Sequence, residues 1–130
     1  KYTKIPYVNK PVSRILFGTA IPPFMMGGDG NHLLDAMFER ESQHFDTARN
    51  YMAAEISFGK WIEERNIRDK IVILSKCGHP SMFGKKRISE IEIRKDFENL
   101  LNYLHTDYLD IYMLHRDDPE VSVGEIIEIF

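Results

Sequence analysis

The stretch Ile71–Lys76, read as IVILSK, is apolar at its first four positions and ends in a charged side chain. A second run of this kind, IYMLH (111–115), follows further along the chain. Strands that are apolar throughout are typical of parallel sheets covered by crossover helices. The two runs therefore predict an α/β fold with a parallel sheet.

Strand-like and helix-like segments alternate along the whole chain, and no Pro/Gly-rich linker divides them. We therefore predict one unit over 1–130 with no separate second domain. The last segment has no stop signal, so we expect the chain to end within an element. The predicted strand and helix pairs are 13–20 with 31–41, 43–48 with 53–66, 70–76 with 89–105, and 108–115 with 124–130.

The loop after the first predicted strand, IPPFMMGGDG (21–30), separates two possible architectures. A doubly wound dinucleotide-binding fold needs a tight G-x-G-x-x-G turn at this point, and this loop is longer and does not spell that motif. We expect instead a flexible loop ending at a helix cap on Asn31. The fold predicted is a parallel (β/α)8 barrel of the TIM type, with only about its first four βα units present.

Composition excludes several classes of partner. The formal net charge is -3 and the pI is about 6.0, which provide no positive field for nucleic acid or an anionic membrane surface. No apolar run is long enough to cross a bilayer, and the start lacks the apolar core of a secretory signal. The single cysteine, Cys77, favours a reducing, cytoplasmic location. A protein that acts on a small molecule is the class that remains.

Three polar residues stand where predicted strands end, namely Asp46, Lys76 and His115. In barrel enzymes the carboxyl ends of the strands form the rim where chemistry takes place. Tyr51 follows Asp46 closely enough for its ring to reach the same rim. Period-2 counting puts Lys76 and His115 on the faces of apolar residues that would line the barrel interior, namely Val72, Leu74, Leu109, Ile111 and Met113.

These residue types can together protonate a carbonyl oxygen. A cation within about 4 to 6 Å of a phenol stabilises the phenolate and lowers the phenol pKa, so Lys76 would make Tyr51 a better proton donor. Asp46 would keep Lys76 charged and oriented, and His115 could donate a hydrogen bond to the carbonyl oxygen. Any one of them alone is more often a solvated residue or a local cap, and the prediction rests on their convergence.

Several motifs resemble the aldo-keto reductase family across the chain from GTA (18–20) to the last helix. They are FDTARNY (45–51), the E-x-x-x-G pair Glu55 and Gly59 with Trp61, IVILSK (71–76) and LLNYLHTDYLDIYMLHR (100–116). The resemblance implies a (β/α)8 barrel that transfers a hydride from NADPH, or NADH, to an aldehyde or ketone. The chain would then be the N-terminal half of that barrel.

The resemblance also assigns roles by motif position. Tyr51 would be the proton donor, Lys76 would lower its pKa, Asp46 would pair with Lys76, and His115 would orient the carbonyl. Gly18 and Thr19, with Asp46, would lie against the nicotinamide ribose of the cofactor. No metal is implied, and the groups that hold the cofactor's phosphates and adenosine would come from later strands of the family fold.

Two alternatives to catalysis remain open from the sequence. The same barrel could serve as a cofactor-sensing or regulatory subunit, or the 130 residues could be an inactive fragment. Half a barrel would expose two sheet edges and an apolar interior, so we expect it to self-associate. The basic run Lys85–Arg87 could contact an anionic substrate or cofactor, or form a solvated loop.

Overall fold

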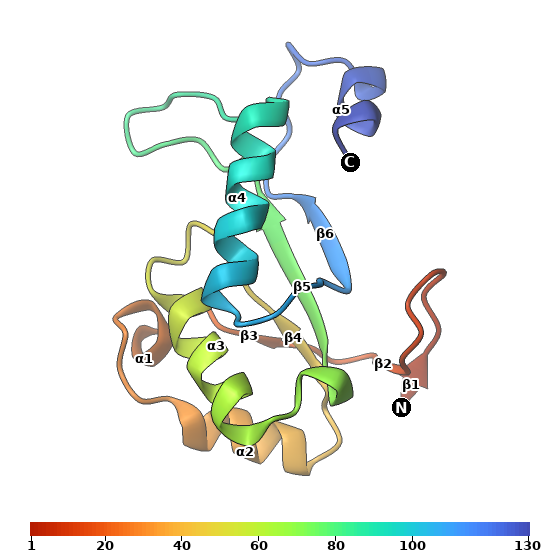
Figure 1. The fold of residues 1–130 in the computed structure, drawn as a ribbon, viewed down its shortest axis with the longest axis vertical. Coiled ribbons are helices and arrows are strands. Elements are labelled where there is room, and N and C mark those ends of the chain that lie inside the picture. The colour runs from red at the N-terminus through yellow and green to blue at the C-terminus, as the bar shows by residue number, and fades with distance from the viewer.

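A computed structural model describes residues 1–130 and contains one four-stranded parallel sheet. The strands lie side by side in chain order, so the sheet has no point at which the order reverses (Figure 1). A doubly wound fold has such a reversal, and a barrel does not. The predicted barrel-type α/β fold is confirmed for these units: β3 (Phe17–Gly18), β4 (His44–Asp46), β5 (Val72–Cys77) and β6 (Ile111–Leu114).

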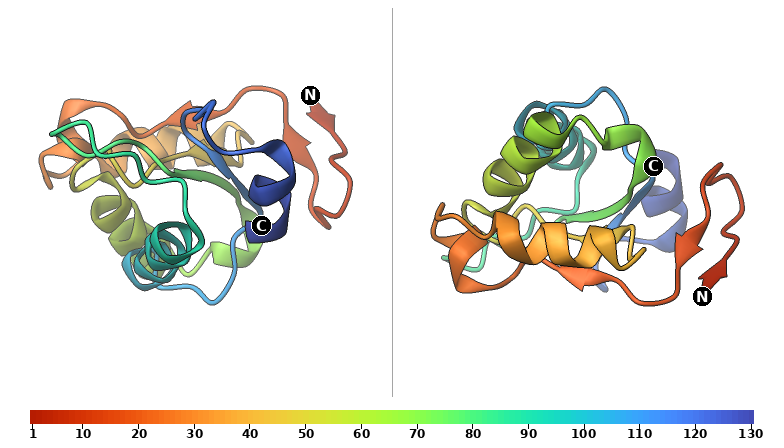
Figure 2. Two further views of the ribbon diagram at one scale, coloured as in Figure 1. Left: turned by 90° about the horizontal axis from the view of Figure 1, so that it is seen from above. Right: turned by 90° about the horizontal axis from the view of Figure 1, so that it is seen from below.

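Each strand is followed by a helix, and the first three of these helices curve around one side of the strands (Figure 2). Ser89 caps the third of them by accepting a hydrogen bond from the Glu92 N–H at 3.4 Å. The helices that follow the strands are α2 (Asn31–Glu39), α3 (Ala54–Arg65), α4 (Glu90–Tyr103) and α5 (Val123–Ile129), and a 3-10 turn, η1, spans Arg68–Lys70.

The first predicted strand, 13–20, is wrong in its extent. Ser13 pairs with Tyr2 in an antiparallel hairpin of β1 (Tyr2–Thr3) and β2 (Val12–Ser13), and only Phe17–Gly18 joins the main sheet. The chain therefore bends between the two sheets, a tertiary feature that alternating hydrophobicity does not encode.

The loop predicted over 21–30 contains one helical turn, α1 (Pro22–Met25). Prolines suit the first positions of a helix because these positions need no N–H donor there. Phe24 within this turn is fully buried and fixes the loop to the core. Asn31 is the first residue of α2 rather than its cap, which is Gly30.

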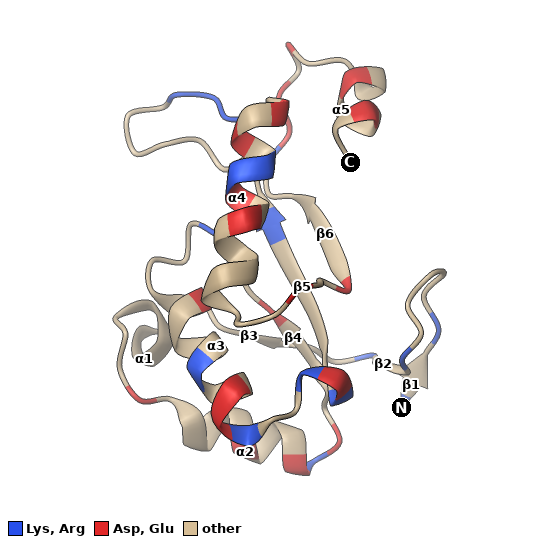
Figure 3. Ribbon diagram, in the orientation of Figure 1, with Lys and Arg blue, Asp and Glu red and all other residues tan.

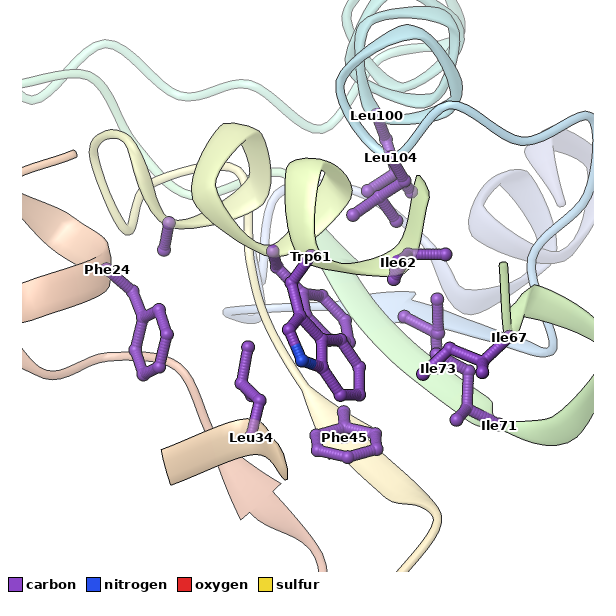
Figure 4. Packing of buried hydrophobic residues seen from close by; sticks show 12 residues of the cluster. Phe24, Leu34, Phe45, Trp61, Ile62, Ile67, Ile71, Ile73, Leu100 and Leu104 are labelled. Atoms are coloured by element: carbon purple, nitrogen blue, oxygen red, sulfur yellow. The ribbon is translucent and has the colours of Figure 1, made fainter. Parts of the chain in front are cut away.

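The main core lies between the sheet and the helices (Figure 4). Trp61 of α3 packs against Phe45 of β4 with ring centroids 5.4 Å apart, and its indole N–H donates to Asp35 at 2.8 Å. Ile56 of the same helix is 39% exposed and lies outside this core. The other members of the core cluster are Phe24, Leu34, Ala54, Phe58, Ile62, Ile67, Ile71, Ile73, Leu100 and Leu104.

Helices α3 and α4 approach each other closely at Gly59. A Cβ atom on Gly59 would lie 1.8 Å from the carbonyl oxygen of Tyr103, which is far inside van der Waals contact. The glycine of the E-x-x-x-G motif therefore allows the C-terminal end of α4 to rest on the backbone of α3. This contact fixes the spacing of the two helices that cover β4 and β5.

A cluster of salt bridges connects the N-terminal segment of the chain to the N-terminal ends of the strands. The carboxylate of Asp110 is 6% exposed and lies 2.9 Å from both Lys10 Nζ and Arg68 NH1. It also accepts the main-chain N–H of Ile73 at 3.0 Å. Local sequence patterns do not identify these partners of Asp110, because its two cations come from distant parts of the chain.

Acidic and basic residues both occur along α3 and α4 (Figure 3). None of the helices combines the length and apolar character needed to pass through a membrane.

Candidate active site

The carboxyl ends of β4, β5 and β6 bring the predicted site residues to one end of the sheet. Asp46 is the last residue of β4, Lys76 is the second-last residue of β5, and His115 directly follows β6. The parallel register pairs Asp46 with Leu74 and Lys76 with Met113. Because neighbouring strands are in register, these side chains emerge on the same face.

Lys76 is the centre of this group. Its ammonium forms an ion pair with Asp46, donates to the carbonyl oxygen of Thr47 at 3.0 Å, and donates to the phenol oxygen of Tyr51 at 3.4 Å. The Lys76 and Asp46 side chains are 15% and 16% exposed. In this partly desolvated place the ammonium is held by its partners and can stabilise negative charge on the Tyr51 oxygen.

A tight local turn places Tyr51 over the strand ends. The Tyr51 N–H donates to the carbonyl of Ala48 at 3.0 Å, and the Ala54 N–H at the start of α3 donates to the carbonyl of Tyr51 at 3.0 Å. Between them Met52 has a positive φ of 55°, a left-handed conformation that reverses the chain. Since the lysine donates to its oxygen, the phenol proton of Tyr51 remains free to point elsewhere.

His115 lies against the ring of Tyr51, with centroids 5.6 Å apart and planes at 89°. Its main-chain N–H donates to the carbonyl of Cys77 at 2.8 Å, which continues the pairing of β6 with β5. Burial lowers the pKa of the imidazole, and the nearby ammonium of Lys76 lowers it further. His115 is therefore neutral at pH 7, with one N–H to donate, and its Nδ1 is buried without a protein partner.

Gly18 and Thr19, the predicted cofactor contacts, face different ways. Gly18 pairs with Asp46, and a Cβ on Gly18 would meet only Asp46 Oδ2, at 3.9 Å, so the surface beside it is open. Thr19 is 0% exposed, and its hydroxyl is buried with no partner. Gly18 thus leaves open space beside Asp46, whereas Thr19 is enclosed in the protein.

A buried acid that sequence reasoning did not assign to any chemistry lies behind Lys76. Glu55 of α3 is 4% exposed and accepts a hydrogen bond from the Ser75 hydroxyl at 2.8 Å. Burial raises the pKa of Glu55 to about 7. The signal was present in the sequence, because Ser75 has the opposite parity to Lys76 and therefore faces the helices.

The basic run Lys85–Arg87 is engaged by carboxylates of the chain itself. Lys86 lies 2.8 Å from Asp118 and 2.6 Å from Glu120, and Lys85 lies 3.3 Å from Glu92. Arg87 pairs with Glu92 and with the buried Asp96. These pairs stabilise the loop before α4, and they leave little free positive charge for an anionic ligand.

The thiol of Cys77 is buried next to the site. Burial raises its pKa to about 11, so the unreactive thiol form predominates at neutral pH. No group of three or more His, Cys, Asp or Glu side chains is arranged to hold a metal ion.

The model of the family described as "Aldo/keto reductase family" matches residues 15–130. The chain belongs to the aldo/keto reductase family. The matched region begins just before β3 and includes every strand that contributes to the site. Family membership and the barrel-type sheet are therefore two independent findings that agree.

Individual members of the aldo/keto reductase family are similar over much of the chain. "Aldo-keto reductase YhdN" of Bacillus subtilis is 31% identical over 99% of this chain and 42% of its own length. "Putative aryl-alcohol dehydrogenase AAD6" of Saccharomyces cerevisiae is 30% identical over 74% of this chain and 50% of its own. "Norsolorinic acid reductase A" of Aspergillus parasiticus is 29% identical over 74% and 27%. The chain thus spans half or less of the length of these relatives.

Proposed function

We propose that the protein is an NAD(P)H-dependent oxidoreductase that reduces an aldehyde or ketone. The observation that carries the proposal is the contact of Lys76 with both Asp46 and the phenol oxygen of Tyr51, beside the ring of His115. In this proposal Tyr51 is the proton donor, Lys76 is the cation that stabilises the donor's conjugate base, and His115 is a neutral hydrogen-bond donor at the same rim. All three can favour protonation of the carbonyl oxygen as a hydride is added to the carbonyl carbon.

Each side chain has one step in this proposal. His115 donates its N–H to the carbonyl oxygen and so favours the negative charge that develops there. Tyr51 transfers its phenol proton to the same oxygen. Lys76 stabilises the phenolate that remains, and Asp46 keeps Lys76 in place and charged.

The open surface beside Gly18 and Asp46 fits the flat nicotinamide end of the cofactor. NADPH, or NADH, supplies the hydride when bound. Gly18 would allow close approach because it has no side chain, and Asp46 would accept a hydrogen bond from the ribose. The proposal includes a cytoplasmic location, which the single unpaired Cys77 favours.

The names of the relatives support this reaction class. One is called a reductase and another an alcohol dehydrogenase, and these describe the two directions of one carbonyl–alcohol reaction. Aromatic aldehydes are therefore a suitable first panel of substrates.

The proposed proton donor is tested by Tyr51→Phe in the full-length polypeptide, with Tyr103→Phe as the control. Tyr103 is the last residue of α4 and is 41% exposed, and its hydroxyl forms no hydrogen bond with Asp46, Tyr51, Lys76 or His115. General acid catalysis contributes about 10²- to 10⁴-fold, so kcat for NADPH oxidation with an aromatic aldehyde should fall by about that factor. The control should keep the wild-type rate. An unchanged rate in Tyr51→Phe would remove the proton donor and with it the proposal.

A further inference from the structure

The buried carboxylate of Asp96 on α4 joins the two chain segments that carry Tyr51 and Lys76. Asp96 is 2% exposed. One of its oxygens lies 2.8 Å from Arg49 Nε, and the other accepts the main-chain N–H of Gly78 at 3.4 Å. Since Arg49 comes two residues before Tyr51 and Gly78 two residues after Lys76, one carboxylate contacts both segments.

Arg49 is the more exposed partner in this contact, because its side chain is 38% exposed whereas that of Asp96 is 1% exposed. The Arg49 N–H also donates to the carbonyl of Lys76 at 3.2 Å. The arginine is therefore tied to the end of β5 by its main chain and to α4 by its guanidinium. If Arg49 is replaced by a neutral residue, Asp96 still pairs with Arg87, so the buried carboxylate is not left unpaired.

We propose that Arg49 is a positioning residue that, by pairing with Asp96, holds the phenol of Tyr51 within reach of the Lys76 ammonium. This inference rests on the proposed roles of Tyr51 and Lys76. The contact between them is 3.4 Å long, at the outer end of hydrogen-bond distances, so a small outward movement of the turn breaks it. Proton transfer from Tyr51 would then lose the support of the ammonium.

The first test reads the phenol directly, by ¹³C NMR of the protein labelled at the tyrosine Cζ. Tyr51→Phe assigns the resonance, and Lys76→Met shows how it moves when the ammonium is lost. In Arg49→Met the resonance should move in the same direction by a smaller amount. In Arg49→Lys, which keeps a cation for Asp96, it should return towards the wild-type position.

The matched control is Arg94→Met, since Arg94 pairs with Glu90 at 2.8 Å on the exposed face of the same helix. It should leave the Tyr51 resonance in place. A Tyr51 resonance in Arg49→Met that coincides with the wild type would overturn the inference. If Arg49→Met does not fold, Arg49→Gln is compared in the same way, and the same coincidence decides against it.

The second test separates positioning from substrate binding. In Arg49→Met, kcat for carbonyl reduction should fall about tenfold, with little change in KM. This fall in kcat is smaller than the roughly 10²-fold cost of a misplacement of about 1 Å. A rise in KM at constant kcat would place Arg49 at the substrate and overturn the positioning role. If Tyr51→Phe keeps full activity, the proposed function fails, while the resonances still decide whether Arg49 holds Tyr51 beside Lys76.

Discussion

Glu55 is an ionisable side chain whose burial makes the fold sensitive to pH. Its pKa is raised to about 7, from a reference value of 4.5, chiefly by burial. The folded protein therefore binds this proton more tightly than the unfolded chain does. The resulting stability is fully present below about pH 4.5 and is lost as the pH rises through about 7.

The change Glu55→Gln should remove this loss, because the amide still accepts the hydrogen bond from Ser75 and carries no charge. Between about pH 5 and about pH 8 the wild type should lose up to about 3 kcal/mol relative to the variant. Urea denaturation across this pH range measures the difference. Glu98→Gln, on the exposed face of α4, is the control and should follow the wild type. If the free energies of unfolding of the wild type and Glu55→Gln differ by the same amount at every pH, the prediction is contradicted.

At the scale of residues, strand-end position and parity were enough to predict that Asp46, Lys76 and His115 would share a rim. The structure brings them together with Tyr51. Their roles in catalysis stay predictions. The roles of Asp96 and Arg49 could not be found in this way, because their contact joins α4 to a loop and depends on how a helix packs on the sheet.

At the scale of elements, Gly59 controls the contact of α3 with α4. Gly59→Ala should destabilise the protein, although alanine is the better helix former, because its Cβ would overlap the carbonyl of Tyr103. Overpacking typically costs about 1 to 3 kcal/mol, more than the ~1 kcal/mol that helix propensity returns. Urea denaturation gives the free energy of unfolding of each variant.

The control is Gly124→Ala in α5, where the nearest atom to a new Cβ would be Ser122 Oγ at 3.9 Å. This variant should be as stable as the wild type or slightly more stable. Equal stabilities for Gly59→Ala and Gly124→Ala would show that α3 can move away from α4 without cost.

Helices were predicted more accurately than strands, for a physical reason. The Ser89 cap of α4 is a local signal, and the observed bounds of α3 and α4 lie within the predicted ranges. The bounds of β3, in contrast, depend on where β2 leaves the main sheet to pair with β1. Tertiary contacts decide which strand each residue pairs with, and the sequence pattern of residues 13–20 does not encode these contacts.

At the scale of the whole molecule, the two outer strands of the main sheet have free edges, and some apolar side chains are in contact with water. β3 and β6 each pair with one neighbour only. Met113 of β6, on the face opposite the core, is 45% exposed. We propose that these 130 residues alone bind a second copy through this face and edge.

Light scattering coupled to size-exclusion chromatography tests this association. Met113→Lys places a charge on the edge strand and should shift the chain towards the monomer. Met82→Lys is the control, because Met82 is 93% exposed but lies on a loop outside the sheet. A wild-type chain that elutes as a monomer at all concentrations would refute the proposal.

The Asp110 cluster lies at the end of the main sheet opposite the candidate active site. Lys10 and Arg68 form salt bridges with Asp110 at the N-terminal ends of the strands, whereas Tyr51 and His115 lie beyond the C-terminal ends. Loops at the C-terminal ends of the strands can therefore be exchanged or lengthened without disturbing the Asp110 cluster at the N-terminal ends. A protein engineer seeking a new substrate range would leave the Asp110 cluster unchanged and vary only the loops around the rim.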